Sequence, residues 1–139
     1  AKSLLSSSSD QYTCRAQSFL EHAKDVENQG KYDLIVSNPP YIPSHDMDTL
    51  QREVKEYEDE RALHGGSDGL SIIKDILDQA APLLSKEGTQ ELWLEVDRSH
   101  PDKIERYVNS EDYRGQFEVI QKINDLSTNP RFVRLRCKH

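Results

Sequence analysis

Hydrophobic and polar positions along the chain form blocks that predict strands and helices in turn. The short apolar run at residues 34–36 shows no period of two, so it predicts a strand covered on both faces in a parallel sheet. Residues 91–96 predict a second strand. Residues 116–123 and 131–137 predict an antiparallel pair, because only the turn-forming residues 125–130 separate them. The pattern therefore indicates an α/β protein.

Several segments between these strands have helical periodicity. Pro101 opens a predicted helix over residues 101–108, and a weaker helical period over residues 19–28 ends before Gly30. A thin apolar stripe over residues 46–57 predicts a polar helix or another ordered segment that covers the protein surface. The strongest amphipathic stripe lies in residues 70–84 and consists of Ile73, Ile76, Leu77 and Ala80.

The first 18 residues have weaker patterns. Residues 1–5 are typical of the last turn of a helix, and the serine run at residues 6–9 predicts a flexible loop. Residues 12–18 predict a further strand. A strand here would precede the helical period at residues 19–28.

A cluster of glycines at residues 65–69 predicts a turn. Its spacing is neither GxGxxG nor GxxxxGK[ST], and no apolar strand precedes it, so it does not predict a phosphate-binding loop. Two glycines allow positive φ angles, and Ser67 or Asp68 can cap the following helix.

The strand at residues 34–36 ends in a stiff corner, Asn38-Pro39-Pro40-Tyr41. Neither proline can donate a backbone hydrogen bond, and Pro39 pushes Asn38 toward extended geometry. The Asn38 side-chain oxygen and the Pro39 carbonyl offer two acceptors to one planar NH2 group, and the Tyr41 ring can lie on its flat face. Asn-Pro-Pro alone would often be only a turn; the apolar strand before it and the aromatic after it favour a site.

Such a corner suits alkylation of an amide or aromatic amine nitrogen. An amide nitrogen is a poor nucleophile because its lone pair is delocalised into the carbonyl. Two acceptors favour its pyramidalisation, and holding it in line with an electrophilic methyl group lowers the barrier further. A dedicated general base is not required, because the methylated nitrogen can lose a proton to water.

Composition narrows the classes of protein that fit. A chain of 139 residues forms one domain at most, and no apolar run approaches the length of a membrane span. The net charge of −7 argues against broad nucleic-acid binding. Cys14 and Cys137 lie far apart and predict free or buried thiols, and the five histidines show no metal-ligand spacing, so no metal site is predicted. The chain starts at Ala1 without a signal or transit pattern, which indicates an excised segment.

Residues 37–43, Ser-Asn-Pro-Pro-Tyr-Ile-Pro, resemble the signature of S-adenosylmethionine-dependent amino methyltransferases. The Asn-Pro-Pro-Tyr part alone is shared with adenine and cytosine amino methyltransferases of nucleic acids. Motifs within residues 53–63, 65–70 and 94–96 narrow the resemblance to release factor glutamine methyltransferases of the HemK/PrmC type. This resemblance covers essentially the whole chain.

The resemblance implies the C-terminal portion of a Rossmann-like class I methyltransferase fold, with strands 3–7 present and strands 1 and 2 missing. The family's strand order is 3-2-1-4-5-7-6, so residues 1–139 would be a partial catalytic domain. The glycine-rich loop that binds S-adenosylmethionine is not in this chain, so the segment is not expected to bind that cofactor alone. Phe19 and Asn38 are the candidate cofactor contacts, although Ser18 stands where the family has an acidic residue. Glu53 and Glu58 would help to order a lid.

The implied enzyme is a protein-(glutamine-N5) methyltransferase that modifies the Gly-Gly-Gln glutamine of a peptide chain release factor in translation termination. Asn38 and Pro39 would accept from the amide, Pro40 would set the loop geometry, and Tyr41 would pack on the amide plane. The release factor is thus the expected partner, without direct nucleic-acid or membrane binding. Resemblance of residues 94–101 and 130–132 to the eukaryotic organellar branch implies mitochondria, otherwise the cytoplasm. The alternatives are a nucleic-acid adenine N6-methyltransferase and a non-catalytic fragment that only binds a partner.

Overall fold

A four-stranded mixed sheet runs through the computed structural model, which describes residues 12–44 and 64–138. The strands are β1 (Leu34–Ser37), β2 (Glu91–Glu95), β3 (Phe117–Asn124) and β4 (Pro130–Cys137), in the order β1-β2-β4-β3. β1 is parallel to β2, whereas β4 is antiparallel to both of its neighbours. The four strands predicted from residues 34–36, 91–96, 116–123 and 131–137 are therefore confirmed, and so is the antiparallel pair.

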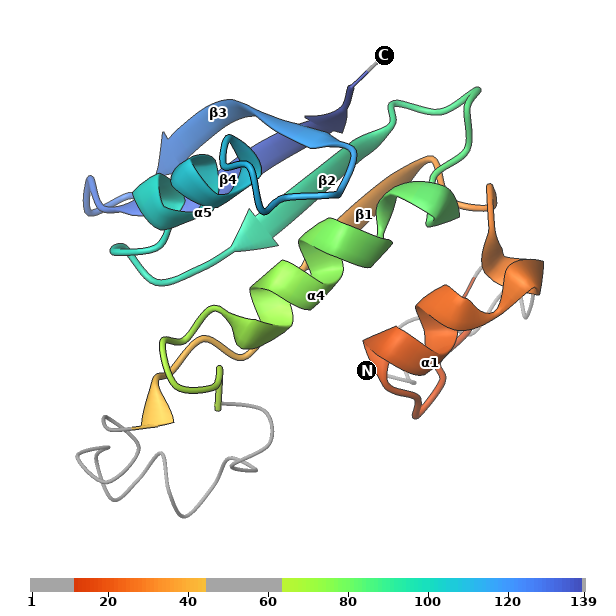
Figure 1. Ribbon diagram of the computed structural model, residues 1–139, viewed down its shortest axis with the longest axis horizontal. Coiled ribbons are helices and arrows are strands. Elements are labelled where there is room, and N and C mark those ends of the chain that lie inside the picture. The colour runs from red at the N-terminus through yellow and green to blue at the C-terminus, as the bar shows by residue number, and fades with distance from the viewer. Residues whose placement is uncertain (1–11, 45–63, 139) are drawn as a thin grey trace.

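Helices cover one face of this sheet. They are α1 (Phe19–Lys24), α4 (Ser71–Gln79) and α5 (Pro101–Val108), with short 3-10 turns η2 (Val26–Asn28) and η4 (Ala81–Leu83). Figure 1 shows α4 and α5 side by side in front of the strands, with α1 beside α4. All three helices lie within segments where helical periodicity was predicted. Ser18 and Glu21 form a reciprocal capping box that starts α1.

The core lies between these helices and the inward face of the sheet. Ile73, Ile76 and Leu77 of α4 are buried, which confirms the predicted stripe, and Ala80 after the helix is buried with them. On the strands, burial follows the period of two expected for a sheet with one covered face. The buried apolar strand side chains are Leu92, Leu94, Phe117, Val133, Leu135 and Cys137, and Glu91 of β2 is also buried.

Two local predictions were wrong. The strand β1 is not covered on both faces: Leu34 is 45% exposed and Val36 is 71% exposed. They lie opposite Glu91 and Trp93 in register, whereas Ile35 between them packs against the core. Residues 12–18 form no strand, because none of the four strands of the described chain pairs with them.

Some predicted segments lie outside the described residues. These are the helical turn at residues 1–5, the serine run at residues 6–9, the helix at residues 46–57 with Glu53, and Glu58. Within the described ranges, no helix is long and apolar enough to span a bilayer, and no cluster of three acidic, histidine or cysteine side chains is arranged as a metal site. Both cysteines are free, Cys14 exposed and Cys137 buried, as predicted.

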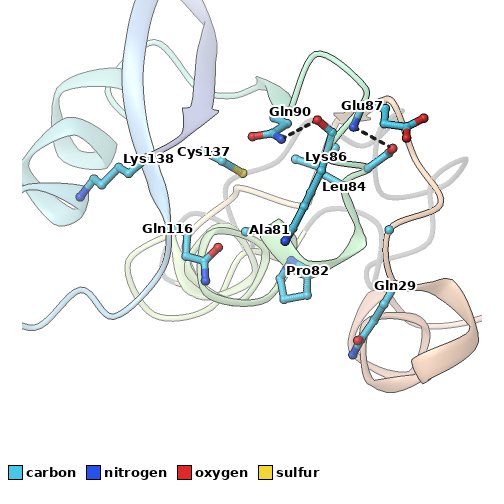
Figure 2. Close-up of a pocket in the computed structure, with 12 residues that line it drawn as sticks. Gln29, Ala81, Pro82, Leu84, Lys86, Glu87, Gln90, Gln116, Cys137 and Lys138 are labelled. Carbon is cyan, nitrogen blue, oxygen red and sulfur yellow. Dashed lines mark hydrogen bonds between the residues drawn. The ribbon is translucent and has the colours of Figure 1, made fainter.

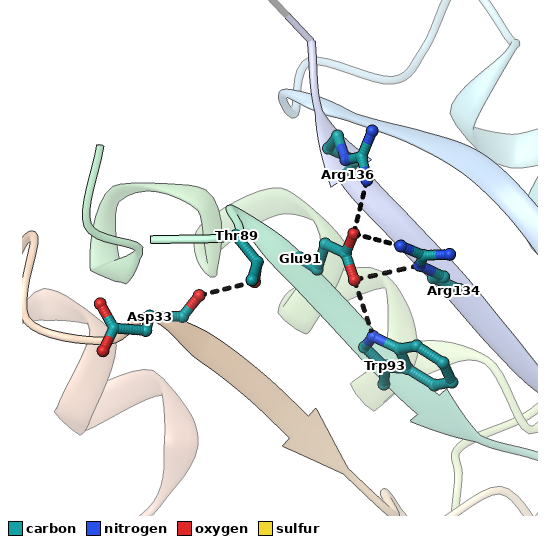
Figure 3. Close-up of polar contacts among 6 residues, drawn as sticks. All are labelled: Asp33, Thr89, Glu91, Trp93, Arg134 and Arg136. Atoms are coloured by element: carbon teal, nitrogen blue, oxygen red, sulfur yellow. Dashed lines mark hydrogen bonds and ion pairs between the residues drawn. The ribbon is translucent and has the colours of Figure 1, made fainter. Parts of the chain in front are cut away.

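A carboxylate network joins β2 to β4 on the open face of the sheet. Figure 3 shows Arg134, Arg136 and Trp93 converging on Glu91. Arg134 donates to the Glu91 carboxylate at 2.6 and 3.0 Å, Arg136 at 2.7 Å, and the Trp93 indole at 3.1 Å. The arginine hydrogen bonds lower the pKa of Glu91 from its ordinary 4.5 to about 2. The network therefore holds a charged carboxylate that is only 6% exposed.

We expect Glu91→Gln to destabilise the fold by about 3 kcal/mol, because it leaves two arginines without their counter-charge. The pKa of Glu91 is lower in the folded protein than in the unfolded chain, so its contribution is complete above pH 4.5 and is lost as the pH falls toward 2. Urea unfolding across this pH range measures both effects. The stability gap between wild type and variant should narrow in acid, and a constant gap would contradict the assignment.

Candidate functional site

The Asn-Pro-Pro-Tyr corner lies directly after β1, at the edge where the parallel strands β1 and β2 end. Open α/β sheets generally bind ligands outside the carboxyl ends of their strands. Asn38 is exposed, Pro39 is buried, and Pro40 and Tyr41 are partly buried. Within residues 12–44 and 64–138, no group hydrogen-bonds to the Asn38 side chain or to the Pro39 carbonyl. Asn38, which carries one of the two predicted acceptors, is therefore exposed at this edge, whereas Pro39, which carries the other, is buried.

The chain after Tyr41 is fixed to the glycine turn at residues 65–69. The Gly65 N–H donates to the Ile42 carbonyl at 2.8 Å, and the Ser44 N–H donates to the Gly66 carbonyl at 2.9 Å. The predicted turn is confirmed: Gly66 has φ +88° and Gly69 has φ +74°. The predicted cap is wrong: the N-cap residue of α4 is Leu70, without a side-chain cap hydrogen bond, and the Asp68 carboxylate accepts from the Leu70 N–H at 3.0 Å within the turn.

These glycines also leave room for Tyr41, a role that the sequence did not reveal. A Cβ atom on Gly65 would lie 2.7 Å from the Tyr41 Cα. A Cβ atom on Gly69 would overlap the Tyr41 carbonyl oxygen and lie 3.1 Å from the His100 imidazole. The turn therefore packs closely against the backbone of the corner, and only glycine fits at positions 65 and 69.

Arg131 and His100 contact the Tyr41 ring from other elements. The Arg131 Nη2 donates to the Tyr41 hydroxyl at 3.1 Å, and its guanidinium lies 5.6 Å from the ring centroid. The rings of Tyr41 and His100 meet edge to face, with centroids 6.2 Å apart and planes at 82°. The sequence analysis missed both residues, because Arg131 is 90 positions from Tyr41 and no local pattern joins them.

A buried imidazole lies beside the Tyr41 ring. His100 is 1% exposed, and burial, reinforced by the charge of Lys103, lowers its pKa below the ordinary value. Burial acts to raise the pKa of Asp97, but hydrogen bonds from Ser99 and the nearby charges of His100 and Arg131 leave that pKa lowered. The Arg131 guanidinium and a buried imidazole thus lie beside Tyr41, and the pKa values of His100 and Asp97 are both lowered.

The structure does not bring Phe19 to the corner. Phe19 is partly buried and lines a cavity of about 610 Å³ with residues that include Ser18, His22 and Tyr32. The His22 Nε2 and the Tyr32 hydroxyl are 2.8 Å apart on this wall. No residue from 38–41 lines the same cavity. The role of Phe19 in cofactor binding stays a prediction.

A larger cavity of about 830 Å³ lies at the opposite edge of the sheet, as Figure 2 shows. Its lining includes Gln90, just before β2, and Cys137, at the end of the antiparallel β4. Both positions mark the edge where β1 and β2 begin. The size of this cavity therefore does not make it the site, because the Asn-Pro-Pro-Tyr corner lies at the other edge.

Comparisons with known proteins identify the family of this chain. The family model described as Eco57I restriction-modification methylase matches residues 2–92. The human MTRF1L release factor glutamine methyltransferase is 40% identical over 108 residues, which is 77% of this chain and 31% of the human protein. The release factor glutamine methyltransferase of Geobacter sulfurreducens is 51% identical over 67 residues, or 48% of this chain and 22% of that protein.

A third relative, the release factor glutamine methyltransferase of Clostridium botulinum, is 32% identical over 111 residues, 80% of this chain and 37% of its own length. The chain thus spans about a third of the curated relatives that it matches. The family match covers well over half of the chain. The chain therefore belongs to the Eco57I restriction-modification methylase family, and the curated proteins that it resembles are release factor glutamine methyltransferases.

Proposed function

We propose that a longer protein containing this segment methylates the side-chain amide nitrogen of the glutamine in a release factor Gly-Gly-Gln motif. The observation that supports this proposal most directly is the exposed Asn38, followed by Pro39, at the carboxyl edge of β1. The names of the curated relatives support the same substrate class. The release factor would then be the protein partner.

In this proposal each residue of the corner has a separate role. The Asn38 oxygen and the Pro39 carbonyl accept the two amide hydrogens, and the Tyr41 ring packs on the amide plane. Pro40 keeps the carbonyl of Pro39 fixed in direction. The amide nitrogen is thereby held in line with the methyl group that it attacks. This orientation lowers the activation barrier of methyl transfer.

S-adenosylmethionine would supply the reactive methyl group as a sulfonium. With that methyl group supplied, the corner would hold the amide nitrogen that receives it, and one amide proton would pass to water. No residue of the corner has to act as a base.

We further propose that the four strands correspond to strands 4 to 7 of a Rossmann-like methyltransferase sheet. The observed order β1-β2-β4-β3, with β4 antiparallel, has the same sequence and directions as the 4-5-7-6 end of that sheet. Strands 1 and 2 would then pair along the open edge of β1, where Leu34 and Val36 are exposed. The segment would be part of a catalytic domain rather than a complete one.

The residues present fit only one end of the cofactor. The cavity beside Phe19 has the aromatic wall and the size for a flat base, whereas the sequence contains no GxGxxG loop for the charged end. We therefore expect the isolated segment not to bind S-adenosylmethionine tightly. Calorimetric titration checks this, with a longer protein that contains the segment as the positive control. Micromolar binding by the segment alone would contradict the expectation.

Transfer of label to a release factor tests the proposed activity. The longer protein is incubated with a release factor and methyl-labelled S-adenosylmethionine, and mass spectrometry locates the label. Label on the Gly-Gly-Gln glutamine supports the proposal. Label on DNA or RNA in a parallel reaction, with none on the release factor, would refute it.

A nucleic-acid amino methyltransferase is the second candidate, because the matching family model is named for a restriction-modification methylase. Charge weighs against it. The chain carries −7, and Arg131, Arg134 and Arg136 of β4 all form ion pairs with Glu91 or Glu95. These arginines are therefore a poor surface for phosphates. A third candidate, a non-catalytic fragment that only binds a partner, would be removed by methylation with the segment alone.

We propose a mitochondrial location for the longer protein. The support is the resemblance of residues 94–101 and 130–132 to the organellar branch, together with the similarity to a human relative over 77% of the chain. Fractionation of cells that express the tagged longer protein tests the location. Recovery in the cytosolic fraction would contradict it.

A further inference from the structure

We propose that Arg131 is a positioning residue that fixes the orientation of the Tyr41 ring. The inference rests on the proposed function, because it assigns Tyr41 to the amide plane of the substrate. Arg131 does not itself touch the reacting atoms in this assignment. It acts through Tyr41, and its effect on methyl transfer should therefore disappear when the Tyr41 ring is absent.

The backbone of Arg131 is held rigidly by the sheet. Arg131 is the second residue of β4, and its carbonyl accepts from the Val96 N–H at 2.9 Å, just beyond β2. The next residue, Phe132, is in register with Glu95. A side chain that starts from such a fixed point can hold a loop in place, because little of its own backbone can move.

The guanidinium of Arg131 makes two kinds of contact with one phenol. It donates to the Tyr41 hydroxyl at 3.1 Å and lies 5.6 Å from the ring centroid. Arg131 also forms an ion pair with Glu95 at 3.5 Å, which is longer and partly exposed. The hydrogen bond sets the position of the hydroxyl, and the contact with the ring restricts its tilt.

This arrangement leaves two buried polar atoms without partners. Within the described parts of the chain, neither the Arg131 Nε nor the His100 Nδ1 has a hydrogen-bond partner. A buried unpaired donor or acceptor costs about 1–3 kcal/mol, and such groups are rare in folded proteins. Both belong to residues that contact the Tyr41 ring. The fold thus keeps an unfavourable arrangement around this one side chain, as functional sites often do.

A fixed ring matters because an aromatic packed on an amide plane must have the right tilt before the nitrogen is in line with the methyl group. A displacement of about 1 Å at a reacting centre can cost on the order of a hundredfold in rate. Arg131 would hold Tyr41 in place before the substrate binds. Lysine cannot substitute, because an ammonium lacks the planar fork of donors.

The kinetic test compares Arg131→Met, Arg131→Lys and a matched control, Arg136→Met. Arg136 lies on the same strand, pairs with Glu91 and has no contact with Tyr41. In the longer protein, both Arg131 variants should lower kcat by on the order of tenfold, with little change in the KM for S-adenosylmethionine. In a Tyr41→Ala background, Arg131→Met should change kcat by less than about twofold. An equal loss in both backgrounds would show that Arg131 acts on stability alone.

A spectroscopic test is independent of activity. Tyrosine labelled with ¹³C at Cζ gives one NMR signal for each ring, and loss of a signal in Tyr41→Phe assigns Tyr41. In the longer protein, Arg131→Met should shift or broaden the Tyr41 signal, whereas Arg136→Met should leave it in place. An unmoved Tyr41 signal would refute the positioning role. If the wild-type protein methylates no release factor, the proposed function fails, but this signal still decides whether Arg131 holds Tyr41.

Discussion

Asn38→Ala is expected to lower methyl transfer by the longer protein by at least about a hundredfold, the usual cost of removing one fixed hydrogen-bonding group that acts on the reacting centre. The substitution removes one of the two acceptors that would bind the amide hydrogens. Asn38 is exposed, and no group of the described chain hydrogen-bonds to its side chain, so stability should change by less than about 0.5 kcal/mol. Initial rates with a release factor and labelled S-adenosylmethionine measure the loss.

Asn109→Ala is the matched control for this experiment. Asn109 is also an exposed asparagine, at the end of α5, and belongs to no part of the candidate site. It should keep full activity and nearly full stability. If Asn38→Ala keeps more than a tenth of wild-type activity, the role assigned to the corner is wrong.

Gly69→Ala is expected to displace the corner and to destabilise the fold. The added methyl group would overlap the Tyr41 carbonyl oxygen and press on His100, and the φ of +74° is unfavourable for alanine. Overpacking typically costs about 1–3 kcal/mol, in addition to about 1–2 kcal/mol for the left-handed backbone. Chemical denaturation measures the total, and the methylation assay should show a loss of activity even where the variant is folded.

Gly30→Ala separates these two costs. Gly30 has a similar φ of +67°, but no atom lies within 4 Å of the added Cβ. This variant should lose only the backbone part, about 1–2 kcal/mol, and keep its activity. Equal destabilisation by the two substitutions would mean that the close approach to Tyr41 is not what requires glycine at position 69.

The sequence predicted the secondary structure correctly wherever a single local pattern was strong. The stripe of α4, the proline that opens α5, and the hairpin of β3 and β4 are local patterns, and the structure confirmed them. The prediction that both faces of β1 are covered was wrong. It relied on an apolar run without alternation, which suggests two covered faces, whereas in the described chain the helices cover only one face of the sheet. The strand predicted at residues 12–18 is absent because a strand exists only when another strand pairs with it.

The candidate site was only partly visible in the sequence. The four residues of the corner are contiguous, so a motif could indicate them, and their chemical roles stay predictions for the experiments above. Arg131 and His100 reach Tyr41 only through tertiary contacts. The glycine cluster was correctly predicted to be a turn. Its close packing against the Tyr41 backbone is a tertiary contact, which the spacing of glycines in the sequence does not predict.

The 90 residues between Tyr41 and Arg131 have a consequence for biosynthesis. A ribosome completes the corner, the glycine turn and His100 well before it adds the arginine that binds the phenol. A nascent chain halted in β3 would therefore carry every residue of the Asn-Pro-Pro-Tyr motif without this restraint on its aromatic ring. The full rate of methyl transfer in such a protein would be reached only when the last hairpin closes, as a late step of folding rather than an early one.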